Sequence, residues 1–172
     1  KTFDFTGSTC THVAQGGSLF CQSLILGSST TYVDLPGLNG NMIMNGPGSI
    51  TSNGKTIGKV NISQSYDSTA TTTLNDALNS SDRLTVTSGR ISSAYNITAL
   101  NFLDSSSGTG QINSSNNIFF TLTGQSFTGV AGFTISSGIT LYFTSSLAKT
   151  FAGGGGTYPI LMNGGSGIFL IT

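Results

Sequence analysis

The apolar residues of this chain fall in short clusters, and several of these clusters alternate with polar residues. A period of two places successive side chains on opposite faces of a β-strand. Residues 2–6 are a clear example, because Phe3 and Phe5 share one face. Clusters of Gly, Asn and Ser separate the apolar runs, as turn residues do in β proteins. The pattern predicts ten to twelve short strands within residues 2–6, 18–26, 31–35, 49–51, 55–63, 83–87, 90–102, 117–123, 126–135, 139–144, 157–162 and 167–172.

The turn signals predict how these strands are connected. Asn53-Gly54 is the strongest hairpin signal, and residues 163–166 predict a C-terminal hairpin. Helix signals are weak, and residues 71–78 and 145–151 would form short helices at most. Many short strands with regular turns are typical of a single β-sandwich or jelly roll. No repeat of about 20–50 residues is evident, which argues against a solenoid or a propeller.

The composition narrows the function more than the fold. The chain has 172 residues, of which 7% are charged, against about 25% in an ordinary soluble domain. Six cations balanced by six anions do not supply the basic surface of a nucleic-acid binder. Ser, Thr, Asn and Gly together account for 88 residues. Leu, Ile, Val and Phe make up about 26%, above the roughly 20% below which chains tend to stay disordered, so we expect a folded domain.

Catalytic chemistry finds little support in these residues. His12 is the single histidine, and no Gly-x-Ser-x-Gly elbow is present to suggest a catalytic triad. A metal site that combined His12 with the two cysteines would lack a fourth strong ligand. Gly153 to Gly156 is followed by a predicted strand rather than by a helix with Lys-Ser/Thr, so it indicates a flexible loop or a close backbone approach rather than a phosphate cradle. The sequence predicts no enzyme, no metal and no cofactor.

The two cysteines, Cys10 and Cys21, are informative about the cellular compartment of the protein. A disulfide between Cys10 and Cys21 would close a loop of about 12 residues and contribute about 3 kcal/mol in the chain-entropy model. The alternative is two buried free thiols. The sequence contains no signal peptide and no apolar run long enough to cross a bilayer, so we expect no membrane span. A disulfide would indicate an extracellular protein, and this sequence would then be its mature form.

Four Asn-x-Ser/Thr sequons begin at Asn61, Asn79, Asn96 and Asn113. The Asn, Ser and Thr content alone predicts about four such motifs, so they give no independent support for secretion. In a secreted protein each would be a fair acceptor for an N-linked glycan.

The edges of the predicted sheets are poorly protected. Edge strands usually carry Lys, Pro or inward charges that prevent pairing with other chains, and this chain has almost none. Either glycans and loops cover the edges, or the edges are meant to pair. If the edges are meant to pair, we expect residues 1–8 to be a donor strand ahead of a β-domain at 9–172. The competing interpretation is that residues 1–8 form an ordinary first strand of their own domain. The inserted residues would be Thr2, Phe3, Asp4, Phe5 and Thr6.

In its short N-terminal strand, single β-domain, low charge, dispersed sequons and lack of an N-terminal apolar helix, the chain resembles subunits of archaeal extracellular filaments. These are the threads and bundling pili that assemble by donor-strand complementation. The resemblance implies a homopolymer in which the N-terminal strand inserts into the next subunit and glycans coat the filament. It also implies a role in adhesion or cell–cell contact.

Two other functions fit the same composition. A carbohydrate-binding adhesin domain could stack sugar rings on Tyr66, Tyr95 or Tyr158, although such tyrosines more often pack in cores or across strands. A viral capsid protein with a jelly-roll fold would form closed particles instead of threads.

Overall fold

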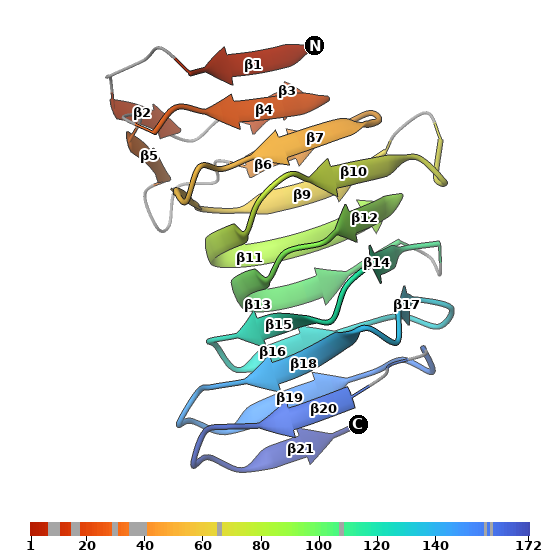
Figure 1. Cartoon of the computed structure of the whole chain (residues 1–172). Coiled ribbons are helices and arrows are strands. Elements are labelled where there is room, and N and C mark those ends of the chain that lie inside the picture. Colours follow the sequence, from red (N-terminus) through yellow and green to blue (C-terminus); the bar gives the residue numbers. More distant parts are fainter. Residues whose placement is uncertain are drawn as a thin grey trace.

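The structure is a computed structural model. It describes residues 1–6, 11–14, 18–28, 31–34, 41–64, 67–106, 109–156, 158 and 160–172, and for 11–14, 31–34, 160 and 162 it describes the backbone. The described chain is all-β, and its strands pair in parallel to form a β-solenoid of about seven turns (Figure 1). The predicted sandwich or jelly roll is wrong, because both folds are built from antiparallel strands. The jelly-roll fold on which the capsid alternative was based is therefore wrong as well.

Each turn of the solenoid contributes strands to up to three faces. We call the first face A, and its seven described strands pair in sequence order. They are β1 (Thr2–Phe5), β4 (Ser23–Leu26), β7 (Gly48–Thr51), β10 (Thr71–Leu74), β12 (Arg90–Ser93), β14 (Gln111–Ser114) and β17 (Thr134–Ile135).

The other two faces meet along β11 (Leu78–Ser88) and β13 (Ile97–Asp104), which run from one face to the next. Face B holds the ends of these two strands together with β3 (Ser18–Cys21), β6 (Asn41–Met44), β9 (Val60–Ser63), β16 (Ser126–Thr128), β19 (Lys149–Ala152) and β21 (Phe169–Ile171). Face C holds their beginnings together with β8 (Thr56–Ile57), β15 (Ile118–Leu122), β18 (Ile139–Phe143) and β20 (Ile160–Asn163). A separate pair, β2 (Thr11–Ala14) and β5 (Thr31–Asp34), continues face C, because β5 contacts β8.

Successive turns of the solenoid repeat the same structure but differ in their number of residues. On face A, Leu24 pairs with Ile50, Ile50 with Leu74 and Leu74 with Ser93. The residue numbers show that these three turns are unequal, and the last of them is the shortest. The conclusion that the chain lacks a solenoid repeat is therefore wrong.

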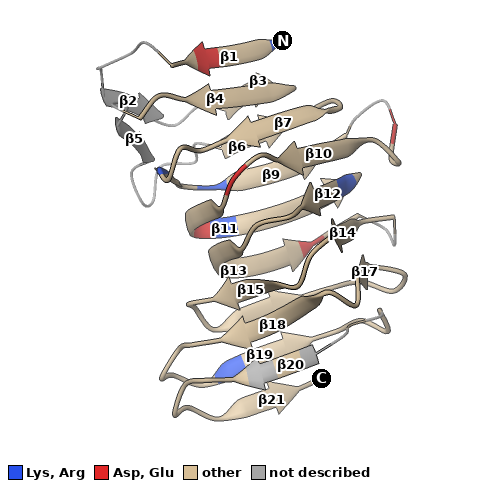
Figure 2. Ribbon diagram, in the orientation of Figure 1, with Lys and Arg blue, Asp and Glu red and all other residues tan. Residues whose placement is uncertain are grey.

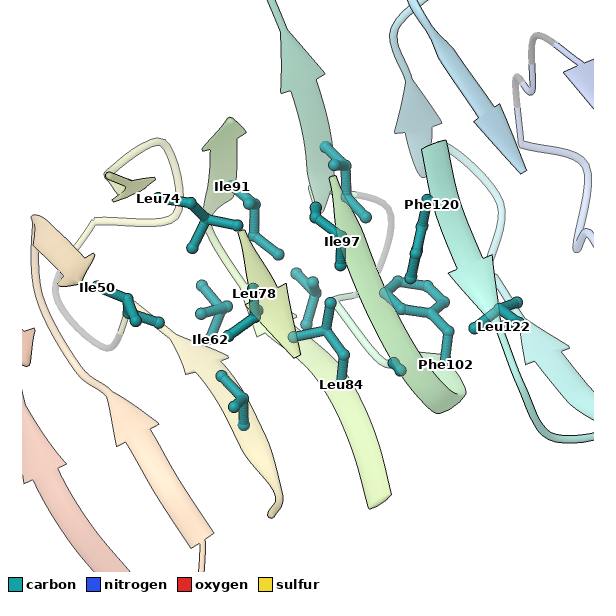
Figure 3. Packing of buried hydrophobic residues seen from close by; sticks show 14 of the residues in the cluster. Ile50, Ile62, Leu74, Leu78, Leu84, Ile91, Ile97, Phe102, Phe120 and Leu122 are labelled. Carbon is teal, nitrogen blue, oxygen red and sulfur yellow. The ribbon is translucent and has the colours of Figure 1, made fainter. Parts of the chain in front are cut away.

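The interior consists of columns in which equivalent residues of successive turns stack on one another. Side chains of faces A, B and C point toward a common centre (Figure 3). On face B one column runs through Leu19, Met42, Val60, Leu84, Phe102, Phe127, Phe151 and Ile171. The ring of Phe127 stacks on those of Phe102 and Phe151, with centroids 4.8 Å apart in both cases. This column is therefore aliphatic and sulfur-containing near the N-terminus and mostly aromatic toward the C-terminus.

The predicted hairpins are corners. At Asn53 and Gly54 the φ angles are 50° and 74°, and this left-handed pair turns the chain from face A to face C. At the C-terminus β20 pairs with β18 and β21 with β19, so the two strands of the predicted hairpin do not pair with each other. The segments with weak helix signals contain β10 and β19 instead.

Candidate assembly surfaces

The predicted donor strand lies in the first turn of its own chain. β1 pairs in parallel with β4, which aligns Phe3 with Leu24 and Phe5 with Leu26. The rings of Phe3 and Phe5 have centroids 6.4 Å apart and pack, partly buried, against the core. This is the arrangement expected for an ordinary first strand, and it places Thr2, Asp4 and Thr6 on the outer side of face A.

Both ends of the solenoid present strands with one open edge. Among the described residues, β1 pairs with β4 alone and β3 with β6 alone, while β20 pairs with β18 alone and β21 with β19 alone. The open edges lie at opposite ends of the stack (Figure 1). Unpaired N–H and C=O groups along such edges are templates for another strand.

Exposed apolar side chains gather at the same two ends. At the C-terminal end Ile168 is 77% exposed and Ile171 is 63% exposed, and Leu170 between them is exposed as well. Ile171 belongs to the inner column of face B, so its exposure arises because no described residue lies beyond it. At the N-terminal end Phe20 is 56% exposed and borders a depression that Lys1 also lines.

Of these end strands, β1 carries the exposed Asp4, which Figure 2 draws in red. β3 and β21 contain no charged residue. Lys149 is buried, and its ammonium group donates to the carbonyl oxygens of Ser145 (2.5 Å) and Leu147 (3.3 Å), so it holds a corner together. The buried carboxylate of Asp104 likewise accepts backbone N–H groups of a corner. Lys59 pairs with Asp82 at 3.6 Å, and both are partly exposed.

The predicted disulfide is wrong, because Cys21 is a free thiol. Its side chain points into the core, where Sγ lies 3.5 Å from the sulfur atoms of both Met42 and Met44. Burial raises the pKa of the Cys21 thiol to about 11. Cys10 lies outside the described residues.

The four sequon asparagines occupy outward positions. Asn61, Asn79 and Asn113 lie in β9, β11 and β14, and no residue next to them in the strand is more exposed than they are. Asn96 lies at an exposed corner before β13. The side-chain oxygen of Asn96 accepts the N–H of Phe119 at 2.9 Å. This bond uses the oxygen, whereas a glycan would be attached to Nδ2.

The structure separates the predicted aromatic candidates. Tyr158 is half-buried among phenylalanine rings, and its hydroxyl donates to the carbonyl oxygen of Gly153 at 2.5 Å. Burial, with a smaller effect of Asp104, raises the pKa of Tyr158 to about 12, so this ring belongs to the core. Tyr95 is exposed at a corner, and Tyr66 lies outside the described residues.

An outward aromatic pair on face C has no counterpart in the sequence prediction. Phe119 is 48% exposed, and its centroid lies 6.2 Å from that of Tyr142 on the next turn. Phe119 stands between buried Ile118 and Phe120. The unbroken apolar run therefore concealed its orientation, and the alternation of the strand is the signal that could have revealed it.

The remaining candidates from the sequence are His12 and the glycine run from Gly153 to Gly156. His12 lies in β2. Gly154, at φ 57°, approaches the Gly129 carbonyl so closely that a Cβ would overlap with it, which agrees with a close backbone approach. In the described segments no three His, Cys, Asp or Glu residues come together as a metal site would need, and no helix has the length and apolarity to cross a membrane.

No protein-family model, curated protein or solved structure matches the chain.

Proposed function

We propose that this chain is a structural subunit of an extracellular filament, in which identical solenoids associate through their ends. The proposal rests on one observation, which is that the strands of each face pair in parallel along one axis, so that another copy can extend the same stack. An open edge gains a full set of backbone hydrogen bonds when it receives another strand. Association through solenoid ends replaces strand insertion as the mechanism, because β1 already completes a turn of its own chain.

The outer surface supports an extracellular structural role. The outward row of face A consists mainly of small polar residues, namely Thr2, Ser23, Ser49, Thr73, Ser92 and Asn113. Such a surface has little charge to repel a neighbour and offers hydroxyl and amide groups for contact. Adhesion or cell–cell contact is the role we assign to it, with N-linked glycans at outward sequons such as Asn79 and Asn96.

Electron microscopy and diffraction of the assembled protein test this function. The chain of residues 1–172 should form unbranched fibres as its concentration rises. Because the strands stack along the solenoid axis, fibre diffraction should show a meridional spacing of about 4.7–4.9 Å. Dispersed single solenoids at every concentration would refute the proposal.

The aromatic pair on face C favours a second candidate function, the binding of neutral polysaccharides. Sugar rings stack on exposed aromatic faces, and Phe119 and Tyr142 present two such faces on adjacent turns. Co-sedimentation with insoluble polysaccharides should decline for Phe119→Ala and stay unchanged for Leu100→Ala, a change at another outward apolar residue. Equal retention of both variants, or no retention of the unmodified chain, would exclude this function.

A further inference from the structure

We infer that Cys21, Met42 and Met44 form a binding site for a single monovalent copper ion inside the solenoid. The inference goes beyond the proposed filament function and does not depend on it. All three ligands are sulfur atoms, one from a thiol and two from thioethers, and such soft ligands suit a soft metal ion.

The three sulfur atoms come together from two adjacent strands of face B. Cys21 of β3 pairs in register with Met44 of β6, and Met42 lies two residues earlier in β6. The Sγ atom of Cys21 lies 3.5 Å from the Sδ atom of each methionine. The chain has two cysteines and three methionines, and every sulfur atom that the structure describes belongs to this cluster. Leucine or isoleucine would fill the same apolar space, so the sulfur atoms are what distinguishes this part of the core.

The distances fit a metal ion with three ligands. With metal–sulfur bonds of about 2.3 Å, as in zinc thiolates, three sulfur atoms around a coplanar ion lie about 4 Å apart. Each methionine sulfur therefore has to move away from Sγ of Cys21 by about 0.5 Å. Methionine has three rotatable side-chain bonds and adapts readily to a shift of this size.

Burial of the cluster selects the charge of the ion. Cys21, Met42 and Met44 are each at most 1% exposed, and a buried net charge is costly unless it is paired. One thiolate and two neutral thioethers around a monovalent cation give a site without net charge. A divalent cation would leave one positive charge uncompensated in the core. Among monovalent ions, thiolate and thioether ligands favour Cu(I).

Binding exchanges a proton for the ion. The S–H bond of Cys21 breaks, its proton goes to solvent, and the thiolate forms a bond to copper, while each methionine donates a sulfur lone pair. Copper stays monovalent throughout, so no oxidant or reductant takes part. The bound ion would join β3 to β6 and stabilise the folded chain, since a ligand that binds the native state shifts the folding equilibrium toward it.

Refolding the full chain with Cu(I) tests the site. The chain of residues 1–172 carries Cys10→Ser, so that Cys21 is its single thiol, and it is refolded from urea without oxygen in the presence of Cu(I) supplied as the acetonitrile complex. After desalting we expect one copper per chain, three sulfur neighbours in the copper X-ray absorption spectrum, and a higher midpoint of thermal unfolding. Zn²⁺ treated in the same way should be lost on desalting.

Methionine variants separate coordination from packing. Met42→Leu and Met44→Leu remove a sulfur atom while nearly keeping the side-chain volume, so both chains should fold, which circular dichroism checks. Met162→Leu, in β20 near the other end of the solenoid, is the matched control. In competition with a chromogenic Cu(I) chelator, each of the first two variants should bind copper at least about tenfold more weakly, and the control should stay within about twofold.

Several results would overturn the inferred site. They are equal copper affinity of Met42→Leu, Met44→Leu and the control, nitrogen or oxygen neighbours of the bound copper, equal retention of Zn²⁺, and a Cys10→Ser chain that retains no copper. Filament formation is measured separately, so a failure of the copper site leaves the proposed function standing, and a failure to form filaments leaves the copper site standing.

Discussion

Replacing Phe127 with alanine tests whether the stacked phenylalanines hold adjacent turns together. The side chain is fully buried, and its ring lies 4.8 Å from those of Phe102 and Phe151. Removing a buried phenylalanine generally costs about 3–5 kcal/mol of unfolding free energy. Backbone ladders fix the turns at about 4.7–4.9 Å, so the walls of the cavity cannot collapse, and we expect a loss of about 4 kcal/mol. The whole domain is stabilised by only about 5–15 kcal/mol, so the variant should fold but be marginal.

Urea denaturation followed by far-ultraviolet circular dichroism measures this loss, and Phe119→Ala is the matched control. The control removes the same ring from an outward position that is 48% exposed, so its cost should stay below about 1 kcal/mol. Both variants should keep the slope of unfolding free energy against urea, because that slope reports the surface exposed on unfolding. Equal destabilisation by the two variants would refute the inward stacking of Phe127.

Three further outcomes follow from the described contacts. In a Cys10→Ser background the thiol of Cys21, with its pKa raised from 9.0 to about 11, should resist thiol reagents at about pH 8 until the chain unfolds, and rapid labelling of the native protein would contradict this. The contribution of this thiol to stability should be lost as the pH rises from about 9 toward 11. Tyr158, with its pKa raised from 10.0 to about 12, should give an ionisation step near pH 12 in a spectrophotometric titration, and Tyr158→Phe should remove that step. Gly48→Ala should destabilise the fold by about 1–3 kcal/mol or more in thermal unfolding, because a Cβ there overlaps the carbonyl oxygen of Gln22.

The positions of many strands could be read from the sequence, whereas their partners could not. Alternation at residues 2–6 and 139–144 marks β1 and β18, because one side of each strand faces the core. Alternation is the same in parallel and antiparallel sheets that bury one face. Asn53-Gly54 favours a hairpin locally, yet the same left-handed pair also forms a corner, and the choice depends on residues a whole turn away. The side chain of Asp76, for instance, accepts the N–H groups of Ser52 and Asn53.

The solenoid repeat was hidden for a related reason. Turns are matched by the stacking of inward residues, while corner length varies freely, so the segment from Val60 to Leu84 is longer than the one from Met42 to Val60. The cysteines illustrate the same limit. Their spacing permits a disulfide, but β3 turns Cys21 into the core, where Met42 and Met44 surround it.

The phenylalanine column also sets a direction for folding. In a solenoid each turn touches only its neighbours, so stability is a sum of contributions from successive interfaces. The interfaces from β13 to β19 contain stacked rings, while those from β3 to β9 contain Leu19, Met42 and Val60. Ordered structure should therefore nucleate around Phe127 and spread toward the N-terminus one turn at a time. Hydrogen exchange should show amide protection falling from β16 to β1, so that a growing filament would expose its most labile turn at one end and its most rigid section near the other.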